Sequence, residues 1–375
     1  MEKKQKSNKF FKTLTALFVI CILLLLFTGL YSSWKLMKSS ATQKQEQPKQ
    51  PEIELYKIIP ADCKECFSAD IIQQYAEQTA NAKITNTKIL KSNTDEAKEF
   101  IKKYDLKRLP ALIITGEIEK VKLQNFQEKE DALIFDQTPP VYLDVASGKI
   151  KGKTTATVLY DTQCTDCFDV GMLAEQLKQI GVSVTIKKID YQSKEGKDLI
   201  KNYKIKKIPT LLLSKDAMEY DQIKTIWQQV GTQETDGMLV LRTINPPYIN
   251  AQTGQRQEAP SIMYISDKTC DKCYNVTLHK KLLESNFGMK FNEERFIDVA
   301  SKDGNRIVSK YKITKVPTVL ISSEAKEYNN FQKLWQSVGI VADDGSYVFT
   351  KLDLIEGATY KDLKNKIIST VQVKK

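Results

Sequence analysis

Apolar and polar positions repeat in the same order three times along the chain. Each repeat opens with an apolar run of strand length, and an amphipathic stretch with apolar residues at helical spacing follows it. The apolar runs cover residues 54–59, 155–160 and 261–266, and the amphipathic stretches cover 68–80, 169–180 and 275–285. These patterns predict a strand and then a helix at the start of every repeat.

A second strand and a second helix are predicted next in each repeat. The strands cover 83–90, 182–190 and 289–299, and the helices, which begin near Ser, Thr or Asp capping residues, cover 93–104, 193–203 and 301–311. A third strand, which contains a proline, is predicted at 108–115, 207–214 and 315–322. This alternation predicts an α/β fold with βαβ crossovers and parallel pairing in a central sheet.

The segments behind the proline strands predict how the repeats end. In the second and third repeats, Trp227 and Trp335 lie on the apolar face of a further helix, which favours core packing over substrate contact. The pairs Pro139-Pro140 and Pro246-Pro247, each followed by a glycine turn, predict short, stiff joints between repeats. Residues 359–372 predict a terminal amphipathic helix that caps the array.

An uncharged apolar segment of 22 residues lies between Lys12 and Lys35. As a helix it is about 33 Å long, which is enough for a hydrocarbon core of roughly 30 Å. We therefore predict one transmembrane helix that contacts lipid through residues 13–34, within an anchor of residues 1–35 that has a cytoplasmic, lysine-rich end. The polar residues 36–52 predict a flexible linker.

This anchor predicts a single-pass protein of the cell membrane, with residues 36–375 outside the cytoplasm. A cleaved signal peptide is the alternative, because Ser39-Ser40-Ala41 offers small residues at a cleavage spacing. The net charge of +11 comes from lysines that are scattered among acidic residues in every repeat, which argues against a nucleic-acid partner. The only histidine, His279, is predicted on a helix surface, and its isolation excludes Ser-His and Cys-His hydrolase mechanisms.

Each repeat contains a Cys-x-x-Cys pair, and the proline follows it at a nearly constant distance. The pairs are Cys63 and Cys66, Cys164 and Cys167, and Cys270 and Cys273; the prolines are Pro110, Pro209 and Pro317. A vicinal dithiol performs reversible two-electron chemistry, so the repetition indicates a protein that handles electrons or disulfides. The six cysteines are the predicted catalytic positions.

The predicted position of each pair, between a strand end and a helix start, makes the first cysteine the nucleophile. There the helix N-terminus would stabilise the thiolate of Cys63, Cys164 or Cys270, and the second cysteine would lie one turn inside the helix. Asp161, Asp166 and Asp169 surround Cys164 in sequence, so its thiolate is expected to be the least favoured of the three.

This order of elements resembles the thioredoxin family. The resemblance is most specific in the stretch Tyr-x-Ile-x-x-Ile-Pro-Thr that ends at Thr210, which has equivalents that end at Ala111 and Thr318. It implies three tandem thioredoxin-like domains, at 53–150, 151–258 and 259–375, each with a mixed central sheet flanked by helices. It also implies that the three prolines are cis, face the dithiols and lie where backbone pairs with an extended substrate segment.

Tandem arrays of such domains resemble protein disulfide isomerases, although the residues inside the pairs differ from the family. Lys64-Glu65, Thr165-Asp166 and Asp271-Lys272 stand there, and the family's buried acid is replaced by Lys57, Val158 and Tyr264. The predicted function is a membrane-anchored, extracytoplasmic thiol-disulfide oxidoreductase or isomerase without a cofactor. Its predicted partners are client proteins with thiols or disulfides and a redox partner.

Two alternatives remain open at the level of sequence. In the first, the domains form a redox-inactive binding or scaffold protein whose Cys-x-x-Cys pairs are structural disulfides. In the second, the pairs bind a metal, with soft Cu(I) as the best candidate. Each pair offers only two ligands where a closed zinc site takes four, so we predict no metal site.

Overall fold

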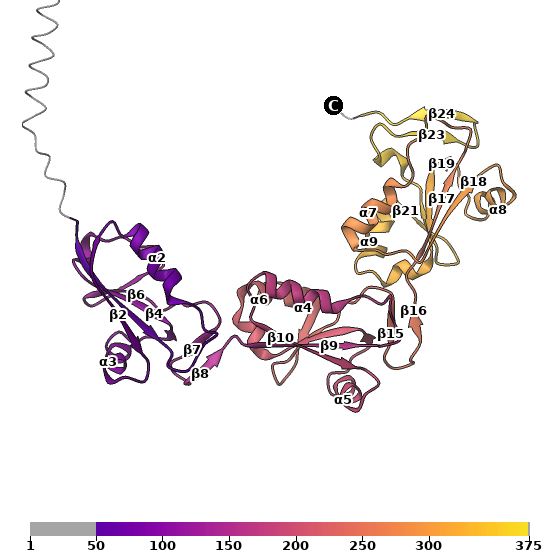
Figure 1. The fold of residues 1–375 in the computed structure, drawn as a ribbon. Helices are drawn as coiled ribbons and strands as arrows, with labels where there is room; N and C mark the ends of the chain where they lie inside the picture. Colours follow the sequence, from indigo (N-terminus) through magenta and orange to yellow (C-terminus); the bar gives the residue numbers. More distant parts are fainter. Residues whose placement is uncertain (1–49, 374–375) are drawn as a thin grey trace, which may run out of the picture.

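The structure, a computed structural model, describes residues 50–373, which fold into three successive units of sheet and helix (Figure 1). The predicted transmembrane helix at 13–34 lies outside the described residues, as does most of the predicted linker. None of the helices within 50–373 has the length and apolarity needed to cross a membrane.

The first unit contains a five-stranded sheet of order β2-β1-β4-β6-β5 and a three-stranded sheet of order β3-β7-β8. Its elements are β1 (Glu52–Ile59), α2 (Ala69–Thr79), β2 (Lys83–Lys91), α3 (Asp95–Lys103), β3 (Arg108–Leu109), β4 (Ala111–Gly116), η1 (Ile118–Lys120), β5 (Gln127–Lys129), β6 (Ala132–Phe135), β7 (Tyr142–Asp144) and β8 (Lys149–Lys151).

The second unit repeats this plan, with sheets of order β10-β9-β12-β14-β13 and β11-β15-β16. Its elements are β9 (Thr154–Tyr160), α4 (Val170–Gln179), β10 (Val184–Asp190), α5 (Lys194–Asn202), β11 (Lys207–Ile208), β12 (Thr210–Leu213), η2 (Lys215–Glu219), α6 (Asp221–Val230), β13 (Gly231–Gln233), β14 (Leu239–Leu241), β15 (Tyr248–Asn250) and β16 (Arg256–Gln257).

The third unit has sheets of order β18-β17-β20-β22-β21 and β19-β23-β24. Its elements are β17 (Ser261–Ser266), α7 (Leu278–Phe287), β18 (Glu293–Asp298), α8 (Lys302–Lys310), β19 (Lys315–Val316), β20 (Thr318–Ile321), η3 (Ser323–Glu327), α9 (Phe331–Val338), β21 (Gly339–Val341), β22 (Tyr347–Phe349), η4 (Leu352–Leu354), β23 (Thr359–Asp362) and β24 (Ile367–Thr370).

Each five-stranded sheet is mixed, as predicted. The first strand pairs in parallel with the second through a βαβ crossover, and it pairs antiparallel with the strand behind the proline. Both faces of the sheet are buried: in β1, Leu55 and Ile58 are fully buried in different apolar clusters. Each such side chain contributes about 1.5–3 kcal/mol to folding. The sheet is therefore a rigid platform whose strand ends hold the loops that follow them.

The second helix of each unit begins where the sequence predicts. The side chains of Thr94, Ser193 and Ser301 accept hydrogen bonds from the backbone N–H three residues ahead and so cap α3, α5 and α8. Trp227 and Trp335 are buried in the cores on α6 and α9, which agrees with the core role predicted for them. The first unit has only η1 at this place.

The predicted terminal helix at 359–372 is wrong, because the segment forms the hairpin β23–β24. The side chain of Asp362 accepts hydrogen bonds from the backbone N–H groups of Lys364 and Asn365, and Lys366 has a φ of 59°. These features close a turn. The β-branched residues behind the turn then pair with β23.

The same hairpin occurs in the other two units as β7–β8 and β15–β16. The segments predicted as joints between repeats are therefore part of the preceding unit. Each hairpin pairs antiparallel with the two-residue strand that ends just before the proline, which is β3, β11 or β19. Each unit therefore ends in a hairpin that pairs with the segment before its own proline.

Candidate functional site

The six predicted catalytic cysteines form three disulfides. Cys63–Cys66, Cys164–Cys167 and Cys270–Cys273 have S–S distances of 2.05, 1.94 and 2.06 Å. All six residues lie in the loop between the first strand and the first helix of their unit. The structure therefore places each pair at the carboxyl end of the first strand, which the sequence predicts.

The three predicted prolines follow cis peptide bonds, at Leu109-Pro110, Ile208-Pro209 and Val316-Pro317. In the second unit, Pro209 lines a cavity of about 200 Å³ together with Cys164 and Cys167. In the third unit, the sulfur of Cys273 lies 4.0 Å from the carbonyl oxygen of Val316, the residue before the proline. These contacts confirm the predicted neighbourhood of proline and disulfide in both units, while substrate binding at the prolines stays a prediction.

The first helix begins too late to serve the cysteines as predicted. Helices α2 and α4 start at Ala69 and Val170, after N-caps at Ser68 and Asp169, and α7 starts later still relative to its cysteines. The second cysteine therefore does not lie one turn inside the helix. Because the dipole effect falls off within about one turn of the helix end, the helix N-terminus acts only weakly on the first cysteine of each pair.

The hairpin explains this late start. The backbone N–H of the residue after the second cysteine donates a hydrogen bond to the hairpin strand or the residue before it, instead of joining the helix. The bonds are Phe67 N–H to Val141 O, 2.7 Å; Phe168 N–H to Pro247 O, 3.2 Å; and Tyr274 N–H to Thr359 O, 2.9 Å. The chain's own hairpin thus holds both the cysteine loop and the short strand beside the proline.

A cation from the hairpin region contacts the acidic side chains of each cysteine loop. In the first unit, Lys153, just behind β8, forms an ion pair with Glu65 at 2.9 Å. In the second unit, Arg256 on β16 contacts Asp166, and its Nη1 lies 3.7 Å from the sulfur of Cys164. This guanidinium lowers the pKa of Asp166 below its ordinary value.

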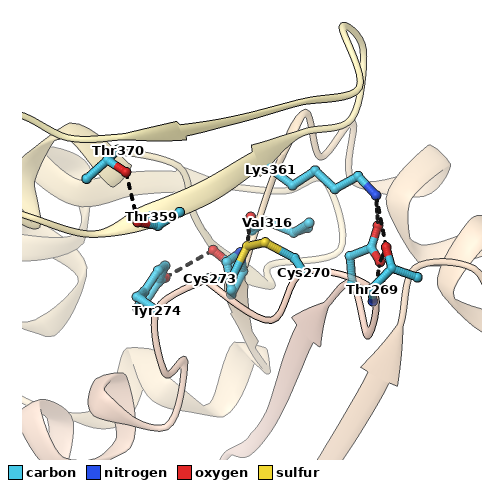
Figure 2. The surroundings of a disulfide bond; sticks show 10 residues. Thr269, Cys270, Cys273, Tyr274, Val316, Thr359, Lys361 and Thr370 are labelled. Atoms are coloured by element: carbon cyan, nitrogen blue, oxygen red, sulfur yellow. Dashed lines mark hydrogen bonds and ion pairs between the residues drawn. A yellow bond between two sulfur atoms is a disulfide. The ribbon is translucent and has the colours of Figure 1, made fainter.

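Figure 2 shows the third site, where β23 passes across the disulfide. Lys361 on β23 donates hydrogen bonds to Asp267 at 2.5 Å and to Thr269 at 3.2 Å. Burial opposes ionisation of Asp267, but the bonds from Lys361 and Thr269 outweigh it and hold the pKa of the carboxyl below its ordinary value. Cys270 is only 8% exposed. The third disulfide is therefore covered by its own hairpin.

The side chains of Asp161 and Asp267 accept backbone hydrogen bonds in the turn before the first cysteine. Asp161 accepts from the backbone N–H of Gln163, and Asp267 accepts from that of Thr269. The turn role that the sequence left open for these two carboxylates is thus present in the structure. In the first unit, Lys57, at the position of the family's acid, is buried and paired with Asp70 at 2.6 Å.

The prediction that His279 lies on a helix surface is wrong, because the side chain is 7% exposed. Tyr274 Oη lies 2.9 Å from His279 Nε2 and 3.0 Å from the carbonyl oxygen of Pro317. The tyrosine has one proton to donate and directs it to Pro317, so we assign the Nε2 proton to the histidine. Burial lowers the pKa of His279 from 6.5 to about 4, which keeps the ring neutral.

Replacing Lys361 by glutamine is expected to speed reduction of Cys270–Cys273 by dithiothreitol about fivefold, because the hairpin loses a charged contact of ~1 kcal/mol. Thiol trapping and mass spectrometry of the full-length chain measure the rate. Lys364→Gln is the control, since it removes the same charge from the exposed hairpin turn. Equal rates for Lys361→Gln and the control would contradict a covering role for this contact.

Sequence reasoning missed Arg256, Lys361 and the buried position of His279. One signal was available: the stretches that start at Tyr142, Tyr248 and Tyr360 each have Asp or Asn two residues after the tyrosine, at the start of a turn. Aligning them would have placed a third hairpin at the end of the chain. The contacts of Arg256 and Lys361 with the cysteine loops join residues about ninety or more positions apart. No local sequence pattern therefore indicates them.

Two cavities larger than the one beside Cys164 have no cysteine in their lining. One of about 600 Å³ is lined by apolar residues of α4 and α6, and one of about 570 Å³ is lined by residues that include Arg242 and Glu327. Within residues 50–373, no group of three or more His, Cys, Asp or Glu side chains is placed to hold a metal ion.

No family model and no curated protein matches the chain. Solved structures do match: full-length ERdj5 at 14% identity, over 57% of this chain and 30% of that chain, with a TM-score of 0.16. An NTD_N/C domain of the alkylhydroperoxide reductase AhpF from Enterococcus faecalis matches at 17% identity, over 44% and 83%, with a TM-score of 0.14. Human ERp44 matches at 8% identity, over 73% and 78%, with a TM-score of 0.13.

The order of elements in the described units establishes the fold. In each unit, a strand leads through a Cys-x-x-Cys loop and a helix to a parallel strand, and a second helix leads to a cis-proline and an antiparallel strand. This is the order of elements that the resemblance to thioredoxins implies. Residues 50–373 thus form three successive domains with a thioredoxin-like fold, each with a Cys-x-x-Cys disulfide and a cis-proline.

Proposed function

We propose that the protein is a thiol-disulfide oxidoreductase that acts on the disulfides of client proteins. The observation that carries this proposal is the repetition of one site in three domains, each a Cys-x-x-Cys disulfide at the carboxyl end of the first strand. A closed three-residue spacing suits exchange, because the second sulfur can resolve a mixed disulfide formed by the first. Cys63, Cys164 and Cys270 are the proposed nucleophiles.

Disulfide exchange by these domains needs no cofactor, because two thiolates and one client disulfide supply all the electrons and bonds. In the reducing direction, the first cysteine's thiolate attacks a client disulfide, forms a mixed disulfide and releases one client thiolate. The second cysteine's thiolate then attacks the first sulfur and releases the other client thiolate, which leaves the domain oxidised. Read backwards, the same steps oxidise a client dithiol. A redox partner that carries thiols or disulfides returns the domain to its starting state.

We also propose that these domains act outside the cytoplasm, tethered by residues 13–34. The support is the uncharged apolar segment flanked by lysines, together with three disulfides, which persist in oxidising compartments. Protease protection of the C-terminal domain in sealed cells tests this: the domain should be cleaved from outside. Protection of the domain until the membrane is opened would contradict the proposal.

A second candidate function is a scaffold with structural disulfides, which the covered Cys270 favours for the third domain. Equilibration with glutathione buffers distinguishes the two functions. Exchange-active pairs should be reduced and oxidised reversibly, with potentials less reducing than about −300 mV, whereas structural pairs should lie below that value. Three potentials all below it would reject the proposed function.

A further inference from the structure

We propose that Arg256 is a catalytic residue of the second domain, whose guanidinium stabilises the thiolate of Cys164 when the disulfide is reduced. The inference rests on the proposed function in one respect only, namely that Cys164 is the nucleophile. The sequence predicts the opposite, namely that the thiolate of Cys164 is the least favoured of the three. That prediction took account of the acidic residues near Cys164 in sequence, where no cation lies.

Arg256 is held at the sulfur by a built arrangement. Its backbone pairs with Ile249 on β15, and β15 pairs in turn with β11, the strand next to Pro209. Ile249 is buried in the cluster against which Cys164 and Cys167 pack. From this base the guanidinium reaches the loop, with Nη1 3.7 Å from Cys164 Sγ.

The remaining donors of the guanidinium fix its orientation. Nη2 contacts a carboxylate oxygen of Asp166, and Nε lies 2.9 Å from Glu258 Oε1. The arginine side chain is 33% exposed, so its charge is only partly screened by water. Because Nη2 and Nε are already held by carboxylates, the planar guanidinium presents Nη1 to the sulfur with little further loss of conformational entropy.

Arg256 places a positive charge within hydrogen-bond distance of this nucleophile. Helix α4 begins at Val170, and the N–H of Gly171 in its first turn donates to the cap Asp169. Across residues 50–373, no other Lys or Arg side chain hydrogen-bonds to a cysteine sulfur. The carboxylates of Asp161, Asp166, Asp169 and Glu258 face or flank the loop, and Lys290 acts on Asp166 from a longer range. Without Arg256 this neighbourhood is predominantly negative.

The chemistry of the other two sites differs. Lys361 in the third domain binds Asp267 and Thr269, and Lys153 in the first domain binds Glu65. Neither makes a hydrogen bond to a sulfur. Because a stabilised thiolate favours the reduced form of a pair, the second disulfide should be the most oxidising of the three. Its reduction by a client dithiol would transfer the disulfide to the client.

The test uses the full-length chain in which Cys21 and the cysteines of the first and third pairs are replaced by serine. Cys164–Cys167 is then the sole pair, and Arg256→Gln, Asp166→Asn and the double variant are compared. Two readouts are taken: the alkylation rate of reduced Cys164 by iodoacetamide at neutral pH, and the equilibrium constant with glutathione. Neither readout requires a client, so failure of this inference is distinguishable from failure of the proposed function.

Arg256→Gln is expected to slow alkylation about threefold and to favour the disulfide about tenfold at equilibrium. The first effect is smaller because a less stabilised thiolate is intrinsically more nucleophilic. Asp166→Asn is expected to act in the opposite direction, and Arg256→Lys should restore part of the lost reactivity. Arg242→Gln is the control, since Arg242 forms a comparable ion pair with Glu234 in the same domain without touching a sulfur.

The double variant decides between two roles for the arginine. If Arg256 acts on the sulfur, its replacement should still slow alkylation in the Asp166→Asn background. If it only neutralises Asp166, the replacement should have no effect there, and the proposal would be overturned. The proposal also fails if Arg256→Gln and Arg242→Gln give the same rate and the same equilibrium constant.

Discussion

Replacing Cys63, Cys164 and Cys270 by serine in one chain is expected to reduce client disulfide exchange to the uncatalysed rate. The three sulfurs are the proposed nucleophiles, and serine cannot form a mixed disulfide under these conditions. The measurement is reduction of insulin by dithiothreitol, followed by turbidity, together with refolding of a scrambled disulfide protein. This is the largest effect that the site predicts.

The single variants give the control. Because each domain holds a complete pair, each single replacement should remove only its own domain's share of the rate, and Cys164→Ser should have the largest effect if Arg256 activates that site. Cys21→Ser, outside the pairs, should leave the rate unchanged. Full activity of the triple variant would show that the Cys-x-x-Cys pairs are not the exchange sites.

Lowering the pH from 7 to 5 is expected to destabilise the third domain by about 2 kcal/mol through His279 alone. Burial lowers the pKa of this histidine from 6.5 to about 4 in the folded domain. Between these two values the unfolded chain binds a proton that the folded chain does not, so stability is lost as the pH falls through this window. Urea unfolding followed by Trp335 fluorescence, with Trp34 and Trp227 replaced by phenylalanine, measures the loss.

The matched variant is His279→Gln, which keeps a hydrogen-bond donor for Tyr274 but does not titrate. Its stability should be nearly independent of pH over the same range. The carboxylates Asp267 and Asp344 have pKa values below their ordinary range, so their contribution is lost only at lower pH. A parallel decline of both chains between pH 7 and 5 would refute the assignment to His279.

Local sequence signals predicted the parts of the fold that depend on local interactions. The capped helices α3, α5 and α8 follow from Thr94, Ser193 and Ser301, and the buried strands follow from the apolar runs. The proline segments were predicted from a stretch that carries its own pattern. These features need only neighbours a few residues away.

The sequence pattern failed where one spacing is compatible with two structures. Leu363, Ile367 and Val371 recur every four residues, which is typical of a helix face, yet the turn at Asp362 and Lys366 makes the segment a hairpin. In sequence, His279 lies between Leu278 and Lys280, but its ring packs against that of Phe349, with centroids 4.5 Å apart. Packing partners distant in sequence determined both outcomes.

The hairpins have a consequence for how a client approaches. The short strands β3, β11 and β19 already have β7, β15 and β23 as antiparallel partners along one edge, so a client peptide finds that edge occupied. It must compete with a tethered strand of the same chain, whose effective concentration is on the order of millimolar. Weakly pairing peptides would lose that competition, so access to each disulfide depends on how readily its own hairpin lifts.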